Sequence, residues 1–147
     1  QVVPGQPALV PAVAHTPHAV AALALTLDNM GFYPTTHAVV GAMGDKDLAP
    51  MLARMDPIID RWYFTDLPTP RAASAAQLQA DWQAVTHRKD AASAVFADPM
   101  AALAAAAAAA TPADRIVVFG SFYTVGGVLA HGVPRLQAGQ PAPDAGS

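Results

Sequence analysis

The stretch Arg115-Ile116-Val117-Val118-Phe119-Gly120-Ser121 decides the fold of this chain. Four consecutive positions, 116–119, are apolar and are bounded by turn-forming residues. That pattern is typical of a strand buried on both faces, as in parallel sheets covered by helices on each side. Gly120 and Ser121 follow at the carboxyl end of this strand, and a last helix is expected to run to about Ala130.

Outside this stretch, short apolar runs alternate with segments of helical period, which indicates repeated strand–helix units. The expected strands lie at 8–10, 37–40, 58–64 and 93–96, and the expected helices at 17–30, 48–55, 74–85 and 99–110. Side chains that can cap amino ends precede three of these helices, at Thr16, Asp47 and Asp98, whereas Ser74 is expected to begin the helix at 74–85. The predicted fold class is therefore α/β: a three-layer α/β/α, Rossmann-like domain with a mainly parallel sheet of five or six strands.

Composition narrows the class of protein. A chain of 147 residues predicts one domain, here residues 1–130, followed by a flexible tail at 131–147 that is rich in Pro, Gly and Ala. The net charge of −3 provides no basic surface for nucleic acid. The absence of cysteine excludes disulfides, cysteine-ligated zinc and thiol catalysis. No membrane span or signal peptide is apparent, and we expect a cytoplasmic protein.

His15 follows the first expected strand and lies beside the start of a helix. In open α/β sheets ligands bind at this edge, where free N–H groups and the helix dipole favour anions. The alternative is that His15 only packs a loop. The histidine spacing predicts no metal site, and no base accompanies Ser121, so we assign no catalytic residue.

Four segments occur in order along the chain: AHTPH (14–18), GAMGDKD (41–47), DRWY with LPTPRA (60–63 and 67–72), and RIVVFGSFYTV (115–125). Together they resemble the C-terminal domain of the bacterial folylpolyglutamate synthase/dihydrofolate synthase family, which belongs to the Mur ligase superfamily. The resemblance covers residues 4–130. It implies an α/β lobe that closes over a nucleotide and helps to hold glutamate.

The family joins glutamate to a pteroate or folate carboxylate, which ATP first converts to an acyl phosphate with the help of magnesium. The phosphate-binding loop lies in a larger N-terminal domain, and no G-x-x-x-x-G-K-[ST] occurs in this sequence. The resemblance thus implies that ATP and magnesium act in the full-length enzyme and that this chain alone binds neither. Its expected partners are the missing P-loop domain and the small molecules ATP, glutamate and folate.

The resemblance also suggests roles for individual residues. His15, with Thr16 beside it, matches the family's nucleotide contact. The residues that match the glutamate side are Ser121, Lys46, Asp47 and Arg71.

Three positions depart from the family pattern. Ala12 stands where the family has a nucleotide-binding Asp, and Thr16 stands where it prefers Asn. Pro11 lies where a central strand is expected, although proline cannot donate to a strand ladder. These departures leave three possibilities open: a diverged copy, an engineered variant, or a stand-alone, non-catalytic binding module derived from this lobe.

Overall fold

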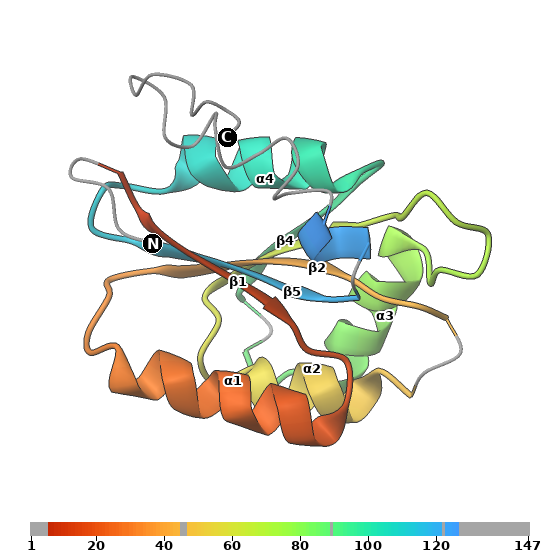
Figure 1. Ribbon diagram of the computed structural model, residues 1–147, viewed down its shortest axis with the longest axis horizontal. Coiled ribbons are helices and arrows are strands. Elements are labelled where there is room, and N and C mark those ends of the chain that lie inside the picture. The colour runs from red at the N-terminus through yellow and green to blue at the C-terminus, as the bar shows by residue number, and fades with distance from the viewer. Residues whose placement is uncertain (1–5, 45–46, 89, 122, 127–147) are drawn as a thin grey trace.

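A computed structural model describes residues 6–44, 47–88, 90–121 and 123–126. Within this part the strands form one parallel sheet in the order β1-β5-β2-β3-β4 (Figure 1). The strands are β1 (Ala8–Val13), β2 (Thr36–Gly41), β3 (Arg61–Thr65), β4 (Ala92–Phe96) and β5 (Arg115–Gly120). The helices are α1 (Pro17–Asn29), α2 (Ala49–Met55), α3 (Ala75–Val85) and α4 (Pro99–Ala109).

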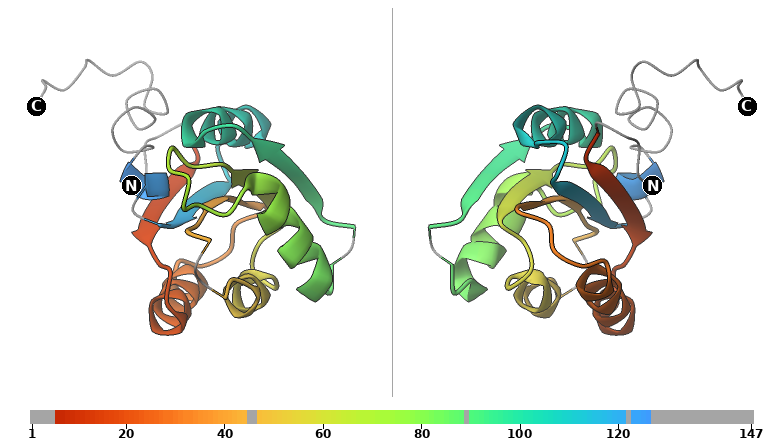
Figure 2. Two further views of the ribbon diagram at one scale, coloured as in Figure 1. Left: turned by 90° about the vertical axis from the view of Figure 1, so that its right-hand side faces the viewer. Right: turned by 90° about the vertical axis from the view of Figure 1, so that its left-hand side faces the viewer.

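Helices cover both faces of the sheet, as predicted. Helices α1, α2 and α3 lie on one face and α4 on the other (Figure 2). Each face has its own apolar core, one rich in large side chains beneath α1–α3 and one beneath the alanine-rich α4. The α/β/α prediction is confirmed, with a sheet of five strands in the described residues.

Strand β5 occupies the interior of the sheet between β1 and β2. Its four apolar side chains alternate between the two cores: Val117 and Phe119 face α1–α3, whereas Ile116 and Val118 face α4. All four are fully buried. The continuous apolar run therefore reflects burial on both faces, as expected.

Two strand predictions were wrong in detail. Strand β1 is an edge strand that pairs only with β5 among the described strands, so Pro11 does not lie in a central strand. An edge strand tolerates proline because one side of it has no neighbour to receive a hydrogen bond. Strand β3 begins at Arg61 rather than at 58, because the N–H groups of Ile58 and Ile59 both donate to the Met55 carbonyl in a turn that ends α2.

The capping predictions are confirmed at α1 and α4, and in α3 Ser74 is the N-cap rather than the first helical residue. The side chains of Thr16, Ser74 and Asp98 accept hydrogen bonds from the first turns of α1, α3 and α4. Asp47 does not cap α2, because Leu48 occupies the N-cap position and makes no side-chain cap bond.

Several predictions lie wholly or partly outside the described residues. Residues 123–126 are helical, as expected for the start of the last helix. Lys46, the remainder of that helix, the domain boundary near 130 and the tail at 131–147 are not described. Among the described helices, none has both the length and the apolarity needed to span a bilayer.

Candidate functional site

Three neighbouring strands end at the same edge of the sheet and carry most of the predicted site. Val13 at the end of β1 and Gly41 at the end of β2 both align with Gly120 at the end of β5. His15 follows β1, the loop at 42–44 follows β2, and Ser121 follows β5. The carboxyl ends of β1, β5 and β2 therefore converge at this edge, where the sequence placed His15.

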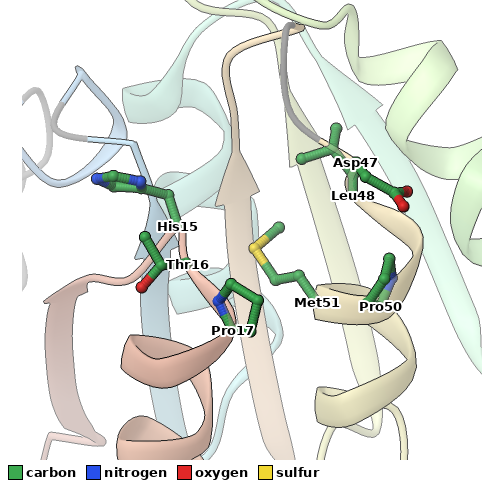
Figure 3. Close-up of a pocket in the computed structure, with 7 residues that line it drawn as sticks. All are labelled: His15, Thr16, Pro17, Asp47, Leu48, Pro50 and Met51. Carbon is green, nitrogen blue, oxygen red and sulfur yellow. The ribbon is translucent and has the colours of Figure 1, made fainter.

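A pocket of about 280 Å³ lies between the amino ends of α1 and α2 at this edge (Figure 3). The exposed His15 stands on one side of it and the exposed Asp47 on the other, with the Asp47 carboxylate pointing away from the imidazole. Apolar side chains form much of the wall between them. The lining residues are His15, Thr16, Pro17, Asp47, Leu48, Pro50 and Met51.

This pocket groups the candidate residues differently from the sequence prediction. Asp47, which the resemblance places with glutamate, lines the same pocket as the nucleotide candidates His15 and Thr16. The Thr16 hydroxyl oxygen accepts from the Ala19 N–H at 3.2 Å, so part of its hydrogen-bonding capacity caps α1. Ser121 is not among the residues that line this pocket.

Ser121 is 4% exposed and belongs to a tight turn. Its N–H donates to the Gly41 carbonyl at 3.0 Å, and its own carbonyl accepts from Thr124 and Val125 at 3.1 and 3.3 Å. Its Oγ lies 3.4 Å from both the N and the Oγ1 of Thr124. Ser121 thus organises the start of the last helix, in addition to any role toward a ligand.

Arg71 lies beside the loop at 42–44. Its carbonyl accepts from the Gly44 N–H at 2.8 Å, and the Ala73 N–H donates to the Ala42 carbonyl at 2.9 Å. Met43 and Ala72 form an antiparallel bridge between these hydrogen bonds. The Arg71 side chain is exposed at this edge.

Backbone hydrogen bonds join the segments into one network. The Ala14 N–H donates to the Gly120 carbonyl at 3.1 Å, which fixes the residue before His15 to the residue before Ser121. Ser121 is bonded to Gly41, and the loop after Gly41 is bonded to the segment of Arg71. A shift in any one segment therefore affects the others.

Ala12 is half-buried and packs against the core beneath α1. It aligns with Phe119 of β5, three residues before His15. A carboxylate at this position would lie near the end of β1, five residues before α1 begins. The alanine supplies packing in place of that charge.

A buried polar cluster lies toward the amino ends of the strands, at the end of the sheet opposite the candidate site. Local sequence patterns do not reveal it. His37 is 1% exposed, with Nδ1 at 2.9 Å from the Tyr63 hydroxyl and Nε2 at 3.1 Å from Asp114. Burial raises the pKa of Asp114, but hydrogen bonds from Thr111 and His37 outweigh it and hold the pKa below its usual value. This cluster connects β2, β3 and the start of β5 and lies away from the candidate site.

No three His, Cys, Asp or Glu side chains within the described ranges are placed to hold a metal ion. A second hollow of about 330 Å³, which sequence reasoning missed, lies at the ends of β3 and β4. Its Asp66 carboxylate accepts from the Ala75 N–H at 2.6 Å and so stabilises the start of α3.

The family model for the Mur ligase, glutamate ligase domain, matches residues 1–122 of the chain. The dihydrofolate synthase/folylpolyglutamate synthase of Escherichia coli K12 is 35% identical over 129 residues, which are 88% of this chain and 29% of that protein. The structure of E. coli FolC in complex with DHPP and ADP has a TM-score of 0.78 at 33% identity, over 88% of this chain and 30% of that one.

A structure of a bifunctional folylpolyglutamate synthase/dihydrofolate synthase with Mn, AMPPNP and L-glutamate bound has a TM-score of 0.75 at 38% identity. It likewise covers 88% of this chain and 30% of that one. The chain therefore spans less than a third of the length of these relatives.

Proposed function

The chain belongs to the Mur ligase family of glutamate ligase domains, and from that premise we propose that it is the C-terminal lobe of an ATP-dependent ligase that joins glutamate to dihydropteroate or folate. The observation that carries the proposal is the network of backbone hydrogen bonds that unites the segments of His15, Gly41, Arg71 and Ser121 at one sheet edge. A ligand at this edge would meet all four segments. The matched relatives bind ADP, or AMPPNP with L-glutamate, according to their structures.

The pocket beside His15 suits a nucleotide. Its apolar wall from Pro17, Leu48 and Met51 offers a surface for a flat base, and His15 offers a hydrogen bond at its rim. When bound, ATP supplies the phosphoryl group that activates the folate carboxylate. We assign His15 and Thr16 to the nucleotide.

Charge guides the assignment on the glutamate side. Glutamate carries two carboxylates and one ammonium group, so cationic side chains suit the former and a carboxylate suits the latter. We assign Arg71 and Lys46 to the carboxylates, Asp47 to the amine, and Ser121 to a hydrogen bond with a carboxylate oxygen. These residues would orient the amine toward the activated folate and hold it there.

We propose that a P-loop domain completes the enzyme, because the chain matches less than a third of the length of its relatives and the sequence lacks a P-loop motif. Magnesium is not assigned to the described residues, since these do not fit a three-ligand metal site. We place it with the P-loop domain.

Reconstitution tests the proposal. The purified chain is mixed with the N-terminal domain of the E. coli relative, and ATP-dependent transfer of labelled L-glutamate to dihydropteroate is measured. We expect transfer with the chain and none without it. His15→Ala should raise the KM for ATP about tenfold, the loss of one good hydrogen bond. The matched control is His18→Ala, an exposed histidine in the next turn, which should leave it unchanged.

The alternative is a non-catalytic binding module derived from the same lobe, and Ala12 favours it. In that case the chain would bind nucleotide or glutamate in a titration but would not support transfer with any P-loop domain. Binding without transfer would therefore reject the ligase proposal and retain the module.

A further inference from the structure

The Gly41 carbonyl at the end of β2 accepts two hydrogen bonds from the segment after β5. The Ser121 N–H donates to it at 3.0 Å, and the Thr124 hydroxyl donates to it at 2.8 Å. Thr124 is fully buried, so its side chain has no surface on which to meet a ligand. Its contacts are all with the protein itself.

The fit between Gly41 and Thr124 is close. A Cβ added to Gly41 would lie 2.6 Å from the Thr124 Oγ1 and 2.8 Å from the Leu67 Cδ2, both too short for real contacts. Glycine at position 41 is what allows the threonine hydroxyl to reach the carbonyl. The sequence pattern did not indicate this pair, because 83 positions separate the two residues.

The single hydroxyl proton of Thr124 determines how Thr124 can hydrogen-bond to Ser121. The Thr124 hydroxyl has one proton, and it is donated to the Gly41 carbonyl. Toward the Ser121 Oγ at 3.4 Å, Thr124 can then only accept through its own oxygen. The serine proton is thus directed toward Thr124 in the free protein and is available to a carboxylate that competes for it.

We propose that Thr124 is a positioning residue that fixes Ser121 against the end of β2 and presents the serine hydroxyl to a ligand carboxylate. The inference rests on the proposed assignment of glutamate to Ser121. Through the Gly41 carbonyl, Thr124 also holds the Ser121 turn in register with the loop at 42–44. Ligand contact remains with Ser121, and Thr124 acts through it.

Three variants of the 147-residue chain test this role. Thr124→Val keeps the shape but removes the donor, and Thr124→Ser keeps the donor. Thr86→Val is the matched control: Thr86 is also buried and donates at 2.7 Å to Asp56, but it lies at the end of α3, away from Ser121. Amide hydrogen exchange at Ser121, titration with L-glutamate followed by NMR, and urea unfolding are measured for each.

We expect Thr124→Val to lower the protection of the Ser121 amide at least tenfold relative to amides of β3 and to weaken L-glutamate binding about tenfold. The loss corresponds to one good hydrogen bond, which is worth about a factor of ten. Thr124→Ser keeps the donor, so both the protection of the Ser121 amide and the affinity for L-glutamate should stay within about threefold of the parent chain. Thr86→Val should lower the urea midpoint while leaving Ser121 protection and glutamate affinity unchanged. That split separates positioning from a general loss of stability.

Unchanged Ser121 protection in Thr124→Val would overturn the inference, as would an equal loss of protection in Thr86→Val. A parent chain that fails to bind L-glutamate would reject the glutamate assignment of the proposed function. The exchange measurement would still decide the role of Thr124 in that case. The two failures are therefore distinguishable.

Discussion

At the scale of single residues, Gly31 and Gly120 have similar backbones in different surroundings. Both have positive φ, +91° and +120°, which favours glycine. A Cβ on Gly31 would meet nothing within 4 Å, whereas one on Gly120 would overlap the Gly41 carbonyl oxygen. The first glycine is needed for its backbone conformation alone, and the second also for the close approach of two strand ends.

Alanine substitution at each position should separate these two requirements. Gly31→Ala should lower the free energy of unfolding by about 1–2 kcal/mol, the cost of a left-handed backbone for an L-residue. Gly120→Ala should lower it by more than about 3 kcal/mol, because steric overlap adds to the strain. Urea denaturation of the two variants checks this. Equal losses would mean that β2 and β5 separate easily at this end.

Ala12→Asp should lower the stability of the fold and raise the affinity for a nucleotide. Ala12 packs against the core, so a carboxylate there should lower the free energy of unfolding by about 1–3 kcal/mol. In the reconstituted enzyme it should tighten ADP binding about ten- to a hundredfold, because one hydrogen bond to a charged group contributes about 1.5–3 kcal/mol. Calorimetric titration of ADP measures the gain.

Val13→Asp is the matched control for this change. Val13 is the next residue of β1 and is 46% exposed, so the added charge is the same but lies on the surface. We expect no gain in ADP affinity from it. Equal affinities for the two variants and the parent would show that position 12 does not contact the nucleotide.

At the scale of helices and strands, local sequence patterns were sufficient to predict most elements. They failed where the position of an element depends on contacts with another element. The caps at Thr16 and Asp98 act within one helical turn, and each was predictable. The edge position of β1 was not, because it depends on pairing with β5 far along the chain. Asp47 has a capping side chain one residue too early, since α2 begins at Ala49.

Asp56 joins two helices and should make stability depend on pH. It follows α2 and accepts hydrogen bonds from Trp82, Thr86 and His87 at the end of α3. Burial raises the pKa of Asp56, but these hydrogen bonds and the nearby charge of Arg88 outweigh it and hold the pKa below its usual value.

A lowered folded-state pKa gives a definite sign. The stabilisation by Asp56 is fully present above its unfolded pKa of about 3.9 and is lost as the pH falls through the folded value. We expect the free energy of unfolding to decrease below about pH 4. Asp56→Asn should be less stable by about 2–3 kcal/mol at pH 7 and should lose less on acidification. Urea curves from pH 7 to pH 2.5 measure both effects, with the exposed Asp90→Asn as control.

A decline as steep in Asp56→Asn as in the parent chain would contradict this assignment. The acid sensitivity would then belong to another group, and Asp114 in the cluster with His37 is a second described carboxylate with a lowered pKa. An Asp114→Asn variant distinguishes the two. In the variant that lacks the responsible carboxylate, the free energy of unfolding should decrease less as the pH falls.

At the scale of the whole molecule, the sequence was enough to predict which edge of the sheet carries the site. It was not enough to predict how deeply the site residues are buried or which of them lie together. Motifs at strand ends meet at one edge once the strands are parallel, so His15, the loop after Gly41 and Ser121 could be placed together. The burial of Ser121 and the role of Thr124 depend on contacts with Gly41, which no local pattern encodes. The grouping of Asp47 with His15 depends on how α2 packs beside α1.

The isolated chain should release no ADP in the presence of ATP, magnesium, dihydropteroate and L-glutamate. The physical reason is that the sequence lacks the P-loop motif, whose backbone N–H groups enclose the β- and γ-phosphates. A coupled assay for ADP checks this, with the reconstituted mixture as the positive control. ADP release above the no-protein rate by the chain alone would show that it contains a phosphate site of its own.

The strand order β1-β5-β2-β3-β4 also determines how the protein can be made. During synthesis β2, β3 and β4 can pair as they leave the ribosome, but β1 has no partner until β5 has been translated. At about 5–20 residues per second, the segment from Val13 to Arg115 takes roughly 5–20 s to emerge. For that time β1 and the segment that holds His15 lack their hydrogen-bond partners in β5. The site at this edge can therefore assemble only after β5 has inserted between β1 and β2.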